Sequence, residues 1–221
     1  MSAPAGASAH ASASPAGDNA LNFGPASTLD DTVYGACRPG GAPEGGVRIP
    51  DAEVAAWAAA VSARGVTRVV SLLDDAELAS YDTPLPEQYK AHFKRCALRA
   101  RTRRAGRAGL HGAQRLTPPA LRSADFVQLS SDPAAAEAAR ATLVSALREA
   151  HEAGEKVVVH CKLGQQRTGL ALAAWLTAQH GLSPEAAAAE VERAAAAQAL
   201  TRSVDVPKLC GFTTGAATPK P

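Results

Sequence analysis

The fold is decided by one stretch of the chain, Lys156-Val-Val-Val-His-Cys-Lys-Leu-Gly-Gln-Gln-Arg-Thr168. Its run of three valines is typical of a central strand that is covered on both faces. A loop of five residues follows Cys161, and a helical pattern runs from Arg167 to about His180. The stretch therefore predicts a buried strand, a tight loop and a helix, in that order.

The segments on either side alternate between strand patterns and helix patterns. We expect strands at 32–34, 66–73 and 125–129, and helices at 51–65, 74–78, 86–93, 133–154 and from 183 onward. Helix-starting signals support these limits, because Pro50-Asp51, Asp74-Asp75 and Asp132-Pro133 each precede a helical pattern. The alternation indicates an α/β fold with a central, mainly parallel sheet flanked by helices.

Composition sets the expected limits of the domain. Residues 1–27 are rich in Ala and Ser and predict a disordered tail, residues 28–205 form the domain, and residues 206–221 lack periodicity and predict an irregular tail. Residues 94–124 carry many arginines, no carboxylate and the pair Pro118-Pro119, which favours a solvated basic insertion. The alternative is a docking surface for an acidic partner or nucleic acid at 94–122, although no aromatic residue there offers base stacking.

Charge and cysteine spacing indicate the cellular compartment of the protein. The net charge is only +2, and no apolar run approaches the roughly 20 residues of a membrane span. The four cysteines form neither a CxxC pair nor a zinc pattern, so we expect a reducing compartment, no metal and no cofactor. We therefore expect a cytoplasmic protein, with the nucleus as the alternative; the absence of Lys or Arg before Arg38 gives organelle targeting no support.

The loop after Cys161 suits an anion. Its backbone N–H groups and the start of the following helix favour negative charge, and Gly164 permits a turn closed to other residues. Helix starts and nearby cations also lower the pKa of a cysteine, so we expect a thiolate at Cys161. The phosphate group would be surrounded by a continuous set of residues: Cys161, Lys162, Leu163, Gly164, Gln165, Gln166 and Arg167.

These residues carry a family resemblance. His160, Cys161, Gly164, Arg167 and Thr168 match the HCxxGxxR[ST] signature of the protein tyrosine phosphatase superfamily. The compact size and the Val-Tyr-Gly-Ala-Cys-Arg-Pro-Gly run at 33–40 are similar to the small dual-specificity branch. The resemblance covers roughly residues 28–205, apart from the basic insertion.

The resemblance implies a hydrolase that cleaves phosphomonoesters through a cysteinyl-phosphate on Cys161. The implied substrates are phosphotyrosine, phosphoserine and phosphothreonine side chains of proteins. In this reading His160 orders the cysteine and Thr168 assists breakdown of the intermediate. Asp132, which lies 29 residues before Cys161, would be the general acid. Asp132 equally fits a helix cap before Pro133, and Asp125 is the second candidate for the acid.

Two other functions stay open. Lys162 would add positive potential for a phosphoinositide or another small-molecule phosphate, but the loop lacks a second lysine. Gln166 stands where many relatives have glycine, and a regular last helix is not apparent after Ser203. These departures would suit a catalytically weak phosphate-binding module.

Overall fold

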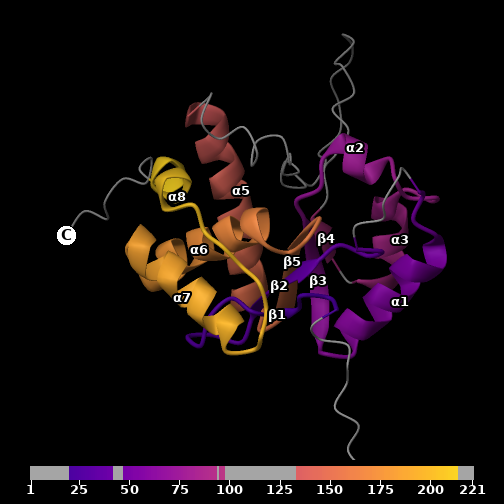
Figure 1. Ribbon diagram of the computed structural model, residues 1–221, viewed down its shortest axis with the longest axis horizontal. Coiled ribbons are helices and arrows are strands. Elements are labelled where there is room, and N and C mark those ends of the chain that lie inside the picture. The colour runs from indigo at the N-terminus through magenta and orange to yellow at the C-terminus, as the bar shows by residue number, and fades with distance from the viewer. Residues whose placement is uncertain (1–19, 42–46, 94, 98–132, 214–221) are drawn as a thin grey trace, which may run out of the picture.

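The computed structural model describes residues 20–41, 47–93, 95–97 and 133–213, which form a five-stranded sheet in the order β1-β2-β5-β3-β4 (Figure 1). The strands are β1 (Gly24–Pro25), β2 (Val33–Cys37), β3 (Val66–Ser71), β4 (Arg95–Ala97) and β5 (Lys156–Cys161). Strands β2, β5, β3 and β4 run parallel to one another, whereas β1 is antiparallel to β2. The expected mainly parallel sheet is confirmed.

Helices pack on both faces of this sheet (Figure 1). They are α1 (Asp51–Ser62), α2 (Asp75–Leu78), α3 (Leu85–His92), α5 (Pro133–Glu152), α6 (Gln166–His180), α7 (Pro184–Ala196) and α8 (Val206–Thr213). One apolar core joins the sheet to α1 and α3, and a second joins its other face to α5, α6, α7 and α8. The chain therefore has the helix–sheet–helix layering that alternating strands and helices require.

Strand β5 lies in the middle of the sheet because its side chains are apolar on both faces. Residues 157–161 are all buried, and the strand pairs with β2 on one side and β3 on the other. Parallel strands end at the same edge of a sheet, so Cys161 at the end of β5 lies beside Cys37 at the end of β2. This edge holds the candidate site.

Helix α6 follows β5 and is buried along most of its length. Every residue from Thr168 to Leu176 is buried, as expected for a helix that is apolar on all sides and surrounded by other elements. The helix ends at Gly181, whose φ of 66° suits a left-handed cap. Although α6 is apolar, no helix in the described ranges has both the length and the apolar character that a membrane crossing needs.

The prediction of a disordered tail over 1–27 is wrong from residue 20 onward. Gly24 and Pro25 pair with Gly35 and Tyr34 of β2, and the side chain of Ala26 is fully buried. Composition gave no sign of this because the pairing uses backbone groups, which every sequence carries. Residues 1–19 lie outside the described ranges.

The predicted basic insertion also begins with ordered chain. Residues 95–97 form β4, which pairs in parallel with residues 68–70 of β3. Ladder hydrogen bonds again come from the backbone, so the arginine-rich composition does not prevent them. The rest of the insertion and the strand expected at 125–129 lie outside the described residues.

The predicted irregular tail from residue 206 is corrected by α8. Leu209 and Phe212 lie three residues apart and are both buried against α5 and α6. Pro207 and Gly211 obscured this short helix, but proline is tolerated in a first turn, where its missing N–H would have no helical partner. Helix α8 begins after Asp205, whose carboxylate accepts a hydrogen bond from the N–H of Lys208 at 3.0 Å.

Candidate active site

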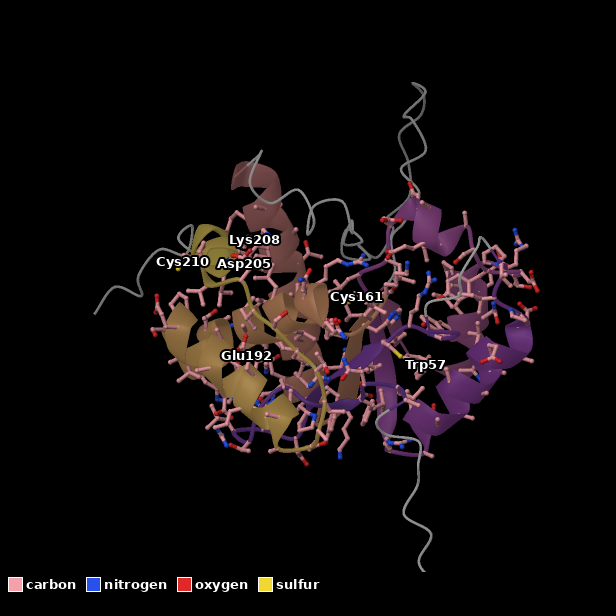
Figure 2. All side chains as sticks on the ribbon, viewed as in Figure 1. Trp57, Cys161, Glu192, Asp205, Lys208 and Cys210 are labelled. Atoms are coloured by element: carbon pink, nitrogen blue, oxygen red, sulfur yellow. The ribbon has the colours of Figure 1, made fainter. Side chains whose placement is uncertain are left out.

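Cys161 lies at the centre of the molecule, where the two groups of helices meet the carboxyl edge of the sheet (Figure 2). Its side chain is almost fully buried, and it faces the core that contains α6. The five residues 162–166, here called the Cys161 loop, lead from it into α6, whose first residue is Gln166. The helix dipole and the free N–H groups at its start therefore lie next to the thiol.

The path of the Cys161 loop depends on Gly164. Its φ is 71°, and a Cβ atom there would lie only 2.6 Å from the carbonyl carbon and oxygen of Ala36. The N–H of Arg38, the residue that follows β2, donates to the carbonyl of Lys162 at 3.3 Å and adds a second contact. Gly164 thus lets the loop pack directly onto the backbone of β2.

Thr168 connects the first turn of α6 to the sulfur. Its hydroxyl donates a hydrogen bond to Sγ of Cys161 at 3.2 Å, and both side chains are buried. The sulfur therefore has a buried hydroxyl donor at the start of α6.

Arg167 is held in place by a carboxylate that sequence reasoning did not single out. Its Nη1 and Nη2 donate to the two oxygens of Glu77 at 2.7 and 2.6 Å, and Nη1 also donates to the carbonyl of Leu72 at 2.9 Å. Although burial alone would raise it, the pKa of Glu77 lies below its usual value because Arg167 pairs with it. The pair is therefore fully charged at neutral pH and fixes the guanidinium beside the loop.

Glu77 is positioned by the short helix α2. The carboxylate of Asp74 accepts from the N–H of Glu77 at 2.7 Å, and the N–H of Asp74 donates to Glu77 Oε2 at 2.9 Å. These two bonds form a capping box, and the spacing D-x-x-E was visible in the sequence. The spacing predicts the cap, but it gives no sign that the same carboxylate reaches Arg167.

His160 points away from the sulfur, because successive residues of a strand face opposite sides of the sheet. Its Nε2 lies 2.9 Å from the hydroxyl of Tyr89, and its ring packs edge-on to Trp57 at 5.4 Å. Burial lowers the pKa of His160 to about 3, although contact with the main chain of Cys161 opposes this shift. His160 is thus a neutral core residue that contacts the Cys161 backbone.

A profile of the tyrosine phosphatase family matches residues 50–204, which is more than half of the chain and includes the Cys161 loop. The chain belongs to the tyrosine phosphatase family. It is therefore a phosphatase, and the resemblance noted for His160 to Thr168 is confirmed. No curated protein matches the sequence.

Two solved structures of phosphatases share the fold. Kinase associated phosphatase is 14% identical and has a TM-score of 0.52, with 83% of this chain and 84% of that chain covered. PTPMT1, in complex with PI(5)P, is 17% identical and has a TM-score of 0.51, with 87% of this chain and 92% of that chain covered. At these identities the comparisons show that this chain and the two phosphatases share a fold.

The remaining residues of the Cys161 loop differ in their exposure. Lys162, Leu163 and Gln166 are exposed, whereas Gln165 is half-buried. The carbonyls of Leu163 and Gly164 accept hydrogen bonds from Asn22, a residue that the sequence placed in the disordered tail. The only sequence feature that could have pointed to Asn22 is that it is an asparagine, because this residue tolerates the positive φ of 47° that it adopts here.

The candidate general acids lie outside the described residues. Asp132 and Asp125 both fall in the segment 98–132, so the sequence is the only basis for their predicted roles. Among the described residues, no group of three His, Cys, Asp or Glu side chains is arranged to hold a metal ion.

Proposed function

We propose that this phosphatase hydrolyses phosphomonoesters through a cysteinyl-phosphate on Cys161, with phosphorylated Tyr, Ser or Thr side chains of proteins as substrates. The Cys161 thiolate attacks phosphorus, and the bond to the leaving oxygen breaks while Asp132 donates a proton to that oxygen. Water then attacks phosphorus and gives a proton to the Asp132 carboxylate, the S–P bond breaks, and inorganic phosphate and the thiolate are released.

The observation that carries the proposal is the hydrogen bond from Thr168 to the Cys161 sulfur at the start of α6. A buried thiol is ordinarily inert, because burial disfavours its ionised form. Here the sulfur lies at a helix N-terminus and accepts a hydroxyl hydrogen bond, which distinguishes it from an ordinary buried thiol. Thr168 would also stabilise the sulfur as it leaves phosphorus.

Arg167 would bind two oxygens of the phosphoryl group. Both of its Nη groups already donate to Glu77, which holds the planar fork in one orientation before substrate binds. Preorganisation of this kind lowers the entropic cost of binding the substrate. His160, which is neutral and packed against Trp57 and Tyr89, would keep the end of β5 in place.

Asp132 stays the proposed general acid on the basis of its position in the sequence. A leaving oxygen with a high pKa needs a proton as its bond to phosphorus breaks, and general acids typically contribute about 10²–10⁴ in rate. If Asp132 instead caps the helix at Pro133, its replacement by Asn would lower the rate of hydrolysis equally for substrates with good and with poor leaving groups. A loss concentrated on poor leaving groups would support the acid role.

The first test is Cys161→Ser, assayed with a generic aryl phosphate. We expect turnover to fall to background with an unchanged thermal midpoint, because the hydroxyl is a far weaker nucleophile than the thiolate. The matched control is Cys210→Ser on α8, which removes another cysteine thiol and should leave turnover unchanged. Turnover that survives in Cys161→Ser would refute the mechanism.

The proposal of a protein substrate rests on the loop's single cation. Lys162 is the one basic residue of the Cys161 loop and is exposed at its rim. A ligand with several phosphates, such as a phosphoinositide, would need more positive charge around the pocket. We expect kcat/KM to be higher for a phosphotyrosine or phosphothreonine peptide than for a phosphoinositide. The reverse order would favour a small-molecule phosphatase, and phosphate binding without turnover would favour a binding module.

A further inference from the structure

The segment that precedes β1 contacts the Cys161 loop through one side chain. Asn22 Nδ2 donates to the carbonyls of Leu163 at 3.1 Å and Gly164 at 3.0 Å. The same carboxamide pairs with Thr201, since Nδ2 donates to its carbonyl at 2.9 Å and Oδ1 accepts from its N–H at 3.1 Å. Asn22 thus links the loop to the chain that follows α7.

These contacts set the direction of two loop peptides. In a planar trans peptide, the carbonyl of one residue and the N–H of the next point in opposite directions. When Asn22 holds the carbonyls of Leu163 and Gly164 on its own side, the N–H groups of Gly164 and Gln165 point away from it. Neither N–H has a hydrogen-bond acceptor within the described part of the chain, so both are available to an anion.

The backbone at Asn22 is itself held firmly. The carbonyl of Leu21 accepts from the N–H of Cys37 at 2.7 Å. The carbonyl of Asn22 accepts from Nη2 of Arg202 at 3.0 Å, and Nη2 also donates to the carbonyl of Gly35 at 2.8 Å. Contacts on both sides of Asn22 therefore attach this corner to β2.

Arg202 is an unusual anchor because its charge is buried without an acidic partner among the described residues. The residue is 7% exposed, and its described partners are backbone carbonyls. Burial lowers the pKa of Arg202 to about 10, so it stays charged at neutral pH. Placing a cation there is costly, which indicates that the corner it holds is important to the fold or to the site.

We propose that Asn22 is a positioning residue of this phosphatase: its carboxamide, anchored by Thr201 and Arg202, holds the Cys161 loop in the conformation that presents the Gly164 and Gln165 N–H groups to the phosphate. The inference rests on the proposed function, because it assumes that the loop binds the phosphoryl group. It adds a residue outside the signature, and outside the residues that the family profile matches.

The test measures phosphate binding separately from turnover. Asn22→Gly removes the carboxamide but keeps the positive φ, which glycine adopts freely. Asn22→Asp keeps the shape and replaces the donor by an acceptor that faces the carbonyls of Leu163, Gly164 and Thr201. We expect both variants to bind inorganic phosphate at least about tenfold more weakly by calorimetry, since the loop must be ordered upon binding. The amide resonances of Gly164 and Gln165 should shift on phosphate addition in the unmodified chain and shift less in both variants.

Thr28→Val is the matched control for stability. Thr28 belongs to the same segment, but its hydroxyl contacts Glu190 and Arg193 on α7 and not the loop. We expect this variant to bind phosphate with unchanged affinity even if its thermal midpoint falls. Asn22→Gly with the phosphate affinity and amide shifts of the unmodified chain would overturn the inference, and so would an equal loss of affinity in Thr28→Val.

The two proposals fail in different ways. If the unmodified chain binds phosphate but Cys161→Ser does not abolish turnover, the mechanism is wrong, and the Asn22 comparison still decides the positioning role. If turnover depends on Cys161 but phosphate affinity is independent of Asn22, the positioning role alone is wrong. A chain that binds no phosphate at all would overturn both.

Discussion

At the scale of single residues, the absence of a side chain at Gly164 decides whether the Cys161 loop can lie on β2. Two conditions coincide there, a φ of 71° and backbone atoms of Ala36 at 2.6 Å from the position of a Cβ. Gly181 shares the first condition, with a φ of 66°, but nothing lies within 4 Å of its Cβ position. A comparison of Gly164 with Gly181 therefore separates the cost of a left-handed backbone from the cost of a steric clash.

Gly164→Ala is expected to be much more damaging than Gly181→Ala. The left-handed backbone costs an alanine about 1–2 kcal/mol at either site, and the clash at Gly164 adds about 1–3 kcal/mol to the loss of unfolding free energy. Displacement of the loop should also lower kcat/KM for an aryl phosphate by about 10²-fold in Gly164→Ala. Urea unfolding and initial rates on both variants measure this. Equal losses at the two sites would show that the contact with Ala36 is unimportant.

The residues of the site differ in how far apart in the chain their partners lie. Cys161 and Thr168 lie only seven positions apart, so their spacing alone predicts their contact. Glu77 reaches Arg167 across 90 positions, and Asn22 reaches the loop across more than 140. No local pattern encodes contacts of this kind, which is why sequence reasoning missed both residues.

At the scale of elements, α8 completes the packing behind the helix that carries Arg167. It contacts α5, α6 and α7, and its residues Leu209 and Phe212 lie in the same core as Cys161. A regular end of the domain removes one argument for a catalytically weak module. The sequence does not predict this helix because its apolar face consists of so few residues.

Leu209→Ala should therefore destabilise the whole domain. Its side chain is fully buried, and truncation of a buried leucine costs about 2–5 kcal/mol of unfolding free energy. The control is Lys208→Ala, since its ion pair with Asp205 is exposed and should contribute less than about 1 kcal/mol (Figure 2). Urea unfolding compares the two variants. A loss below about 1 kcal/mol in Leu209→Ala would mean that α8 is not part of the cooperative fold.

At the scale of the whole molecule, buried titratable groups make stability depend on pH. Burial lowers the pKa of His160 to about 3, whereas an unfolded histidine has a pKa of about 6.5. Between these values the unfolded chain binds more protons than the folded chain, so stability is lost as the pH falls. Glu77 acts in the same direction below its usual pKa. Asp30 does too, because hydrogen bonds from His180 and other donors outweigh the opposing effect of burial on its pKa.

We expect the unfolding free energy to decrease from about pH 6.5 toward pH 4, with His160 contributing a slope of up to about 1.4 kcal/mol per pH unit. Urea unfolding at several pH values measures it. His160→Asn should flatten the slope, whereas His92→Asn, which removes an exposed histidine of α3, should leave it unchanged. A slope that persists in His160→Asn would assign the acid sensitivity to other groups.

By itself the sequence determined the local events around Cys161: a buried strand, a glycine turn and a helix start, because each depends on the chemistry of neighbouring residues. It also determined the family, because the signature lies within nine positions. Only the tertiary structure decided which distant groups complete the site. Glu77, Asn22 and Arg202 act through hydrogen bonds between segments that the parallel sheet brings to one edge, and such bonds leave no periodic trace in the chain.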